Sequence, residues 1–221
     1  MTGVEVFIDP SCPWAWITSR WLAEVAPERD LSVTWRSYCL EIRDDYGVAA
    51  TVPEEYRERA LRGHNLSHRM LRMFEAARAE AGEAAVDALS TEWGRRYFLA
   101  WRAGEVAGDA GDAGDALLAD CLSGCGLSAD FLGAADDDKW DGPIVEAMEV
   151  AYEFGGPKTQ TPTIVVRAPL PYGFKGPVMA PAPTGPAAIR LWDAITVIAE
   201  EPGFFEITRP RVNSPVPPHG G

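Results

Sequence analysis

One cysteine occupies a position where a thiol can be chemically active, at a predicted junction between a strand and a helix. Cys12 lies in Ser-Cys-Pro-Trp, shortly after the apolar run 4–8 and directly before a stretch with helical spacing. The first turn of a helix has unpaired backbone N–H groups and the positive end of the helix dipole, so it stabilises a thiolate relative to a thiol. Cys12 is therefore predicted to be a nucleophile with a lowered pKa.

The residue three positions after Cys12 distinguishes this motif from a dithiol redox motif. A Cys-x-x-Cys enzyme has its resolving cysteine there, whereas this chain has Ala15. Cys12 therefore cannot form the local disulfide. Cys39, just after a predicted strand, is the one plausible replacement for the missing thiol, although a small buried residue is the preferred interpretation.

The composition is that of a globular chain with a strong negative charge. Its 221 residues are enough for one large domain or a domain with an insertion, with 47% hydrophobic residues and a net charge of −13. Nucleic acids and anionic membranes bind clustered Lys and Arg, so neither is expected as a partner. No secretion signal, membrane-spanning stretch or dense disulfide framework is evident in the sequence, and we expect a cytoplasmic location.

Both ends of the chain alternate between strand and helix patterns that could position Cys12. The N-terminal part predicts a strand at 4–8, a helix at 14–26 and a strand at 31–35. The C-terminal part predicts strands at 161–166 and 172–178 and a helix at 187–200, followed by a Pro- and Gly-rich tail that frays or wraps the surface. Two short strands flanking one helix favour a βαβ crossover.

The middle of the chain has helical patterns alone. Apolar stripes containing Met70, Phe74 and Trp93 predict two packed helices, and a further helix is expected at 144–154. A Gly-Asp-Ala repeat at 108–116 predicts a flexible connector whose third copy begins the next helix, 116–122. The order predicts an α/β protein with a thioredoxin-like fold and an all-α helical insertion. The predicted domains are 1–50 with 156–221 for the thioredoxin-like part and 51–155 for the insertion.

A Thr-Pro dipeptide at the start of a late strand is the second informative motif. In a thioredoxin fold, the loop before that strand carries a cis-proline that faces the helix-start cysteine. It exposes backbone groups that pair with a bound thiol compound as a neighbouring strand would. Thr161 and Pro162 have the right place in the predicted order of elements.

Several motifs together resemble a known family. They include Asp9-Pro10-Ser11-Cys12-Pro13-Trp14, Val52-Pro53-Glu54-Glu55-Tyr56-Arg57, Thr161-Pro162-Thr163-Ile164 and Leu191-Trp192-Asp193-Ala194. With these motifs the chain resembles the DsbA-like thioredoxin-fold proteins, and among them the actinobacterial mycothiol-dependent nitroreductases. The resemblance implies a thiol oxidoreductase that uses the low-molecular-weight thiol mycothiol as co-substrate, with no metal and no flavin, on a small hydrophobic or aromatic electrophile.

The resemblance also implies roles for individual residues. Cys12 would be the catalytic nucleophile and Pro162 the cis-proline. The residues that would bind mycothiol and the electrophile are Pro13, Trp14, Tyr56, Thr161 and Pro162. The family pattern has a second cysteine where this chain has Ala15, so the family's dithiol cycle does not transfer directly.

Three chemistries are compatible with a single cysteine. In a monothiol cycle, Cys12 forms a mixed disulfide with mycothiol, and a second mycothiol resolves it. In an addition–elimination cycle, a thiol adds to an electron-poor double bond, rotation follows and the thiol leaves, which is a redox-neutral isomerisation like that of hydroxychromene-carboxylate isomerases. The third is a thiol- or metabolite-binding protein without turnover. The resemblance favours reduction.

Two histidines have the spacing of a metal pair but lack its other ligands. His64 and His68 lie four residues apart on a predicted helix, and no nearby Cys or Glu pattern completes a zinc site. Ordinary helix histidines are therefore expected, with a general-base role for either as the alternative. The sequence does not decide whether the chain forms a homodimer.

Overall fold

The computed structural model describes residues 1–43, 54–100, 112–211, 213 and 215, except for the side chains of Glu55 and Tyr56. It divides into two compact units. The first contains Met1–Ile8, Cys12–Arg36 and Glu149–Gly221. The second contains Asp9–Ser11 and Ser37–Met148. The short segment Asp9–Ser11 thus belongs by its contacts to the second unit, although the chain on either side of it belongs to the first.

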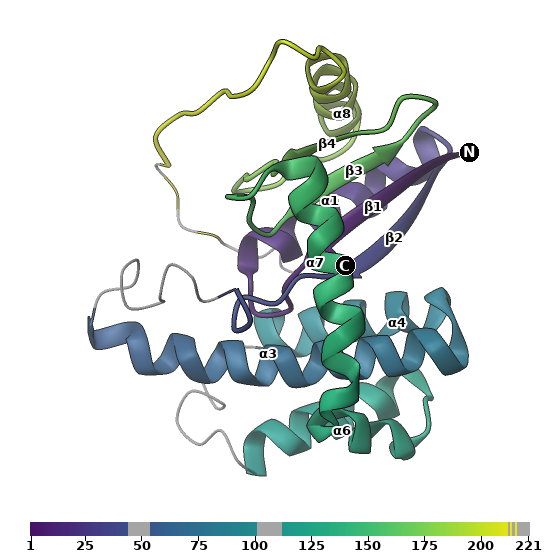
Figure 1. Ribbon diagram of the computed structural model, residues 1–221, viewed down its shortest axis with the longest axis vertical. Coiled ribbons are helices and arrows are strands. Elements are labelled where there is room, and N and C mark those ends of the chain that lie inside the picture. Colours follow the sequence, from purple (N-terminus) through teal and green to yellow (C-terminus); the bar gives the residue numbers. More distant parts are fainter. Residues whose placement is uncertain (44–53, 101–111, 212, 214, 216–221) are drawn as a thin grey trace. The chain divides into compact units, whose positions relative to one another are not determined.

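The first unit is built on a mixed four-stranded sheet (Figure 1). The strand order is β2 (Leu31–Ser37), β1 (Thr2–Ile8), β3 (Thr163–Arg167) and β4 (Tyr172–Lys175). Strands β1 and β3 pair antiparallel with Val6 opposite Ile164, and β3 pairs antiparallel with β4. Both Val6 and Ile164 are fully buried. A strand from the N-terminal part of the sequence and a strand from its C-terminal part are therefore neighbours at the centre of one sheet.

Two helices of this unit pack against each other through aromatic side chains. Helix α1 (Pro13–Glu28) presents Trp21 to Trp192 of α8 (Pro186–Ala199), with the ring centroids 5.9 Å apart. The Trp21 indole N–H also donates a hydrogen bond to the carbonyl of Ala188 at 3.1 Å. Trp21 is only 1% exposed, so its loss would cost about 3–5 kcal/mol.

A glycine lets a third helix approach the sheet of the first unit. Helix α7 (Asp141–Gly155) ends beside β4, and a Cβ atom added at Gly173 would lie 2.6 Å from the Cβ of Phe154. No real side chain fits at that distance. Gly173, which interrupts the apolar pattern of its strand, therefore permits this close packing.

The second unit consists of helices. Its elements are α3 (Glu54–Ala81), α4 (Glu83–Gly94), the π-helical turn η1 (Arg95–Leu99), α6 (Asp112–Cys125), the 3₁₀ segments η2 (Ala129–Asp136) and η3 (Asp138–Trp140), and the first part of α7. Gly82 separates α3 from α4, and its φ of 82° suits a residue without a side chain. The predicted stripes form the core, because Met70, Phe74 and Trp93 are at most 2% exposed.

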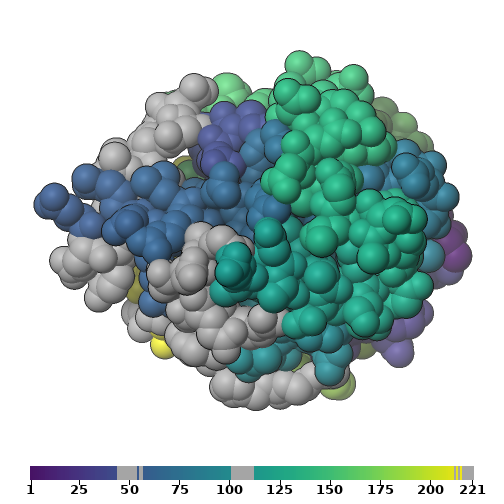
Figure 2. Space-filling model, turned by 90° about the horizontal axis from the view of Figure 1, so that it is seen from below, coloured from purple at the N-terminus to yellow at the C-terminus, as the bar shows by residue number. Residues whose placement is uncertain are grey.

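The start of α6 lies against α3, as the space-filling view shows (Figure 2). A Cβ atom added at Gly114 would lie 3.2 Å from a methyl group of Leu66. Within the described ranges, no helix is long and apolar enough to cross a membrane.

The fold class predicted from the sequence is confirmed, and the differences lie at the ends of elements. Strand β3 begins at Thr163 rather than 161, because Pro162 has no N–H for the ladder. Strand β4 ends at Lys175, before Gly176 with φ 96° and the following Pro177. Helix α6 begins at Asp112, earlier than expected.

Some sequence predictions fall on other parts of the chain. The proposed helix start at 52–53 and the connector at 108–111 lie outside the described residues. The predicted domains, 1–50 with 156–221 and 51–155, remain a prediction about independent folding. The compact units of the structure change from one to the other after Arg36 and Met148.

Candidate active site

Cys12 caps the N-terminus of α1. Its backbone is extended, with φ −82° and ψ 110°, and its carbonyl accepts the first helical hydrogen bond from the N–H of Trp16 at 3.1 Å. Pro13 occupies the first helical position, where a missing N–H costs nothing. As the N-cap residue, Cys12 lies at the positive end of the helix dipole, and the first turn of α1 contains no acidic side chain that would offset it.

The cis-proline loop lies directly against this cysteine. The Thr161–Pro162 peptide is cis, and the Cys12 Sγ lies 3.7 Å from the carbonyl oxygen of Thr161. The Thr161 hydroxyl donates to the carbonyl of Phe7 at 3.2 Å, and the Pro162 carbonyl accepts from the N–H of Gly176 at 2.8 Å. Hydrogen bonds to β1 and to the residue after β4 therefore fix the loop. The structure thus brings together residues 149 positions apart in the sequence.

Trp14 is the accessible aromatic residue beside Cys12. Pro13 and Trp14 are partly exposed, whereas Ala15 and Trp16 are buried. The guanidinium of Arg211, in the C-terminal tail, lies 5.3 Å from the centroid of the Trp14 ring. The tail thus reaches the start of α1, which the sequence did not predict. The side chain of the remaining predicted binding residue, Tyr56, lies outside the described part of the chain.

The other cysteines form no disulfide. All four cysteines are free in the part of the chain that the structure describes. Cys39 is fully buried, its N–H contacts the Met148 sulfur at 3.4 Å, and burial raises its pKa to about 12. Burial likewise raises the pKa of Cys121 to about 12. Neither Cys39 nor Cys121 therefore ionises near neutral pH. This supports the preferred interpretation of Cys39 as a small buried residue.

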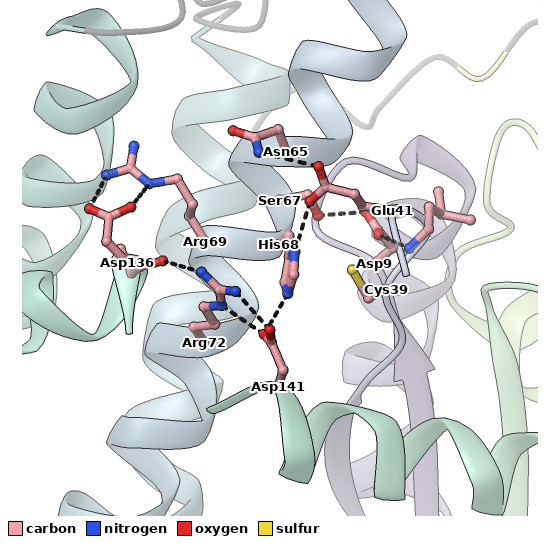
Figure 3. Close-up of polar contacts among 12 residues, drawn as sticks. Asp9, Cys39, Glu41, Asn65, Ser67, His68, Arg69, Arg72, Asp136 and Asp141 are labelled. Carbon is pink, nitrogen blue, oxygen red and sulfur yellow. Dashed lines mark hydrogen bonds and ion pairs between the residues drawn. The ribbon is translucent and has the colours of Figure 1, made fainter. Parts of the chain in front are cut away.

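The His68 side chain is held between two carboxylates of the second unit (Figure 3). Its Nδ1 lies 2.7 Å from Glu41 and its Nε2 lies 2.7 Å from Asp141. Burial lowers the pKa of His68, but hydrogen bonds with Glu41 and Asp141 outweigh it and the pKa stands above its usual value. Asp141 also accepts two hydrogen bonds from Arg72, both at 2.7 Å.

This arrangement leaves neither ring nitrogen of His68 available to a metal. In the part of the chain that the structure describes, no group of three or more His, Cys, Asp or Glu side chains is arranged to hold one. His68 instead connects the segment after β2, helix α3 and the start of α7.

Sequence reasoning overlooked the residues around the loop that leads to Cys12. Asp9 is buried at 1% exposure and bonds to Ser67 of α3 at 2.6 Å. In the sequence, Asp9 is recognisable only as part of the motif 9–14. An acidic residue that directly follows a buried apolar strand was the signal that could have identified it, because a buried carboxylate requires hydrogen-bond donors.

A helix-start cysteine against a cis-proline loop, beside a four-stranded sheet of this strand order, is the arrangement of the DsbA-like thioredoxin fold. The chain belongs to the family described as mycothiol-dependent nitroreductase Rv2466c, whose model matches residues 11–209.

One relative in sequence and several solved structures are similar to the chain over most of its length. The chain is 26% identical over 214 residues to the uncharacterized protein Rv2286c of Mycobacterium tuberculosis, covering 96% of this chain and 83% of the relative. The probable DsbA oxidoreductase SCO1869 from Streptomyces coelicolor superposes with a TM-score of 0.55 at 18% identity, covering 96% of this chain and 94% of the other. The cytosolic disulfide reductase DsbM from Pseudomonas aeruginosa, solved with GSH, gives a TM-score of 0.55 at 16% identity, with coverages of 88% and 99%.

Proposed function

We propose that this protein is a cytoplasmic, mycothiol-dependent oxidoreductase, similar to the nitroreductases, that reduces a hydrophobic or aromatic electrophile through the single nucleophile Cys12. The observation that carries the proposal is the placement of the Cys12 sulfur at the start of α1, 3.7 Å from the carbonyl of Thr161 beside a cis-proline. The family membership supports mycothiol as the co-substrate.

The proposed site has the groups that a thiol co-substrate needs. The cis-proline loop presents backbone groups beside the sulfur, against which an extended thiol compound can align. Trp14, partly exposed next to Cys12, offers an aromatic face to the electrophile. Thr161 and Pro162 are buried, so they hold the loop in place while Pro13 and Trp14 meet the ligand.

The cycle that we propose needs no second protein thiol. The Cys12 thiolate adds to the electrophile and forms a covalent adduct. A mycothiol thiolate attacks the Cys12 sulfur, the product leaves with the bonding electron pair and takes up protons, and a Cys12–mycothiol disulfide remains. A second mycothiol thiolate displaces the Cys12 thiolate. Two mycothiols are oxidised to one disulfide, and the electrophile gains two electrons and two protons.

Redox-neutral isomerisation is the second candidate, and Ala15 is the observation that favours it. A site without a resolving thiol at this position can add a thiol to a double bond and eliminate it again without oxidation. The two reactions differ in the fate of the thiol pool, since only reduction consumes two mycothiols for each product.

The experiment is therefore to measure mycothiol disulfide and product together, in wild type and in Cys12→Ser. Reduction predicts one disulfide for each two-electron product, and a loss of about a thousandfold or more in turnover by Cys12→Ser. Cys39→Ser is the matched control and is expected to retain turnover. Product without disulfide would replace reduction by isomerisation. Full turnover by Cys12→Ser would remove the nucleophile from the proposal, and binding of mycothiol without any turnover would leave a binding protein.

A further inference from the structure

The carboxylate of Asp9 is the centre of a hydrogen-bond cluster in the loop between β1 and α1 (Figure 3). Its Oδ1 accepts from the N–H of Ser11 at 2.7 Å, from the Ser11 hydroxyl at 2.6 Å and from the Ser67 hydroxyl at 2.6 Å. Its Oδ2 accepts from the N–H of Leu40 at 2.7 Å. Four short bonds to one buried carboxylate define the position of the loop closely, because charge-assisted hydrogen bonds are the strong ones.

Each residue of the segment Asp9–Ser11 is bonded to another part of the second unit. Ser67 of α3, itself fully buried, donates to Asp9 and accepts from the N–H of Ser11 at 3.1 Å. Trp93 of α4 donates its indole N–H to the carbonyl of Pro10 at 2.7 Å. The chain therefore leaves strand β1, is fixed to two helices for three residues, and continues into Cys12.

Ser11 is the link between this cluster and the thiol. Its backbone N–H and its hydroxyl are both held by Asp9, and its carbonyl carbon is bonded to the nitrogen of Cys12. Cys12 must keep its extended capping conformation for its sulfur to stay at the start of α1 and 3.7 Å from the Thr161 carbonyl. A shift of Ser11 is transmitted to Cys12 through one peptide bond.

We propose that Asp9 and Ser67 are positioning residues for Cys12, acting through Ser11, the residue directly before it. The inference rests on the proposed role of Cys12 as nucleophile. In chemical terms, the hydrogen-bond cluster around Asp9 keeps the Cys12 sulfur close to the N–H groups of the first helical turn, which stabilise the thiolate. Loosening the cluster moves the sulfur away from them, so a smaller fraction of Cys12 is ionised near neutral pH.

The test compares three serine variants by the rate at which iodoacetamide alkylates Cys12, measured against pH by peptide mass spectrometry. Ser67→Ala removes the hydroxyl that joins Asp9 to Ser11, and Ser67→Thr retains it. Ser90→Ala is the matched control, since Ser90 is a buried helix serine that bonds within its own helix, to the carbonyl of Asp87 at 3.0 Å. Asp9→Asn replaces the Oδ2 acceptor by an amide that cannot accept from Leu40.

We expect Ser67→Ala to move the midpoint of the alkylation profile to higher pH and to slow alkylation at pH 7 about fivefold or more. Ser67→Thr should restore most of the rate, and Ser90→Ala should match wild type even where its stability falls. Asp9→Asn should act in the same direction as Ser67→Ala. Folded Ser67→Ala with the wild-type midpoint and rate would overturn the proposal, even if Asp9→Asn does not fold.

Alkylation uses no mycothiol and no electrophile, so it separates this inference from the proposed function. If the alkylation profile of Ser67→Ala is shifted but the wild-type protein turns over no substrate, Asp9 and Ser67 remain positioning residues and only the oxidoreductase assignment is refuted. If the profile of Ser67→Ala is unchanged and the wild-type protein does turn over substrate, the oxidoreductase assignment remains and the positioning role is refuted. Where turnover is present, Ser67→Ala should lower kcat and leave KM for the electrophile close to wild type, because Ser67 does not line the proposed binding face.

Discussion

Cys12 and Cys39 are two buried thiols, 7% and 0% exposed, that follow neighbouring strands and are followed by different elements. Each follows one of two neighbouring strands by two to four residues, since β1 ends at Ile8 and β2 ends at Ser37. Cys12 caps a helix of 16 residues and faces the carbonyl of Thr161. Cys39 is fully buried with its backbone against Met148, and burial followed by the negative charge of Asp9 raises its pKa.

From their surroundings we expect the two thiols to differ in reactivity, although both follow a strand. What differs is the element that follows. A helix start supplies N–H groups and a favourable dipole to Cys12. Backbone hydrogen bonds from Ile42 and Glu41 lower the pKa of Cys39, but burial outweighs them. The same carboxylate affects both, since Asp9 holds the loop before Cys12 and disfavours the thiolate of Cys39.

The largest effect should appear when the two thiols compete for one reagent. We expect iodoacetamide at pH 8 to alkylate Cys12 at least about a hundredfold faster than Cys39, because a thiol with a pKa of about 12 is ionised at roughly one part in ten thousand there. Peptide mass spectrometry of the folded protein measures both rates. Unfolding in urea should remove the difference, which controls for the intrinsic reactivity of each peptide. Equal rates in the folded protein would refute the contrast.

The next test introduces a second cysteine three positions after Cys12. Ala15→Cys restores the dithiol spacing on α1, and a neighbouring thiol reacts at a high effective concentration. We expect an oxidant to form a disulfide between Cys12 and the introduced thiol, and the yield of the Cys12–mycothiol disulfide to fall about tenfold. Intact-mass measurement distinguishes the two products, and Ala15→Ser controls for size and polarity. An undiminished mycothiol adduct would mean that residue 15 is not where a resolving thiol can act.

Much of this contrast could be predicted from local sequence, and the rest depended on distant contacts. The strand before Cys12, Pro13 after it, and Thr161-Pro162 at the start of a late strand were sufficient to predict a thioredoxin-like site. Motifs of that kind act over a few residues, so they are visible in the sequence. The burial of Met70 and Phe74 followed from helical spacing in the same way.

Two residues of α3, Ser67 and His68, anchor loops of the second unit, and local motifs did not predict this role. Ser67 and His68 are ordinary helix residues until the fold places Asp9 and Glu41 opposite them, 58 and 27 positions away in the sequence. Nothing in the spacing of residues along α3 indicates which distant loop each will meet. The reach of Arg211 to Trp14 has the same cause, because the tail has no periodic pattern from which a contact could be inferred.

The smallest effect concerns the second of these anchors. Adjacent residues of α3 hold the loops that follow the two strands, Ser67 the loop before Cys12 and His68 the segment of Glu41, just after Cys39. His68→Gln should lower the free energy of unfolding by on the order of 1 kcal/mol at pH 5.5, because two charge-assisted contacts are lost. The alkylation rate of Cys12 should not change, since the Asp9 cluster is intact.

The pH dependence of that loss distinguishes a protonated clamp from ordinary packing. The folded-state pKa of His68 is raised, so its stabilising contribution is complete below about 6.5 and disappears as the pH rises through the folded-state pKa. The stability difference between wild type and His68→Gln, from urea unfolding, should therefore shrink between pH 5.5 and 8.5. Arg69→Gln is the control, because Arg69 pairs with Asp136 at 2.8 Å and its guanidinium stays charged throughout this range. For Arg69→Gln we expect a stability difference from wild type that does not change with pH. The same constancy for His68→Gln would show that the imidazole supports its loop by packing rather than by charge. Ser67 would then anchor its loop through hydrogen bonds to a carboxylate, and His68 through shape alone.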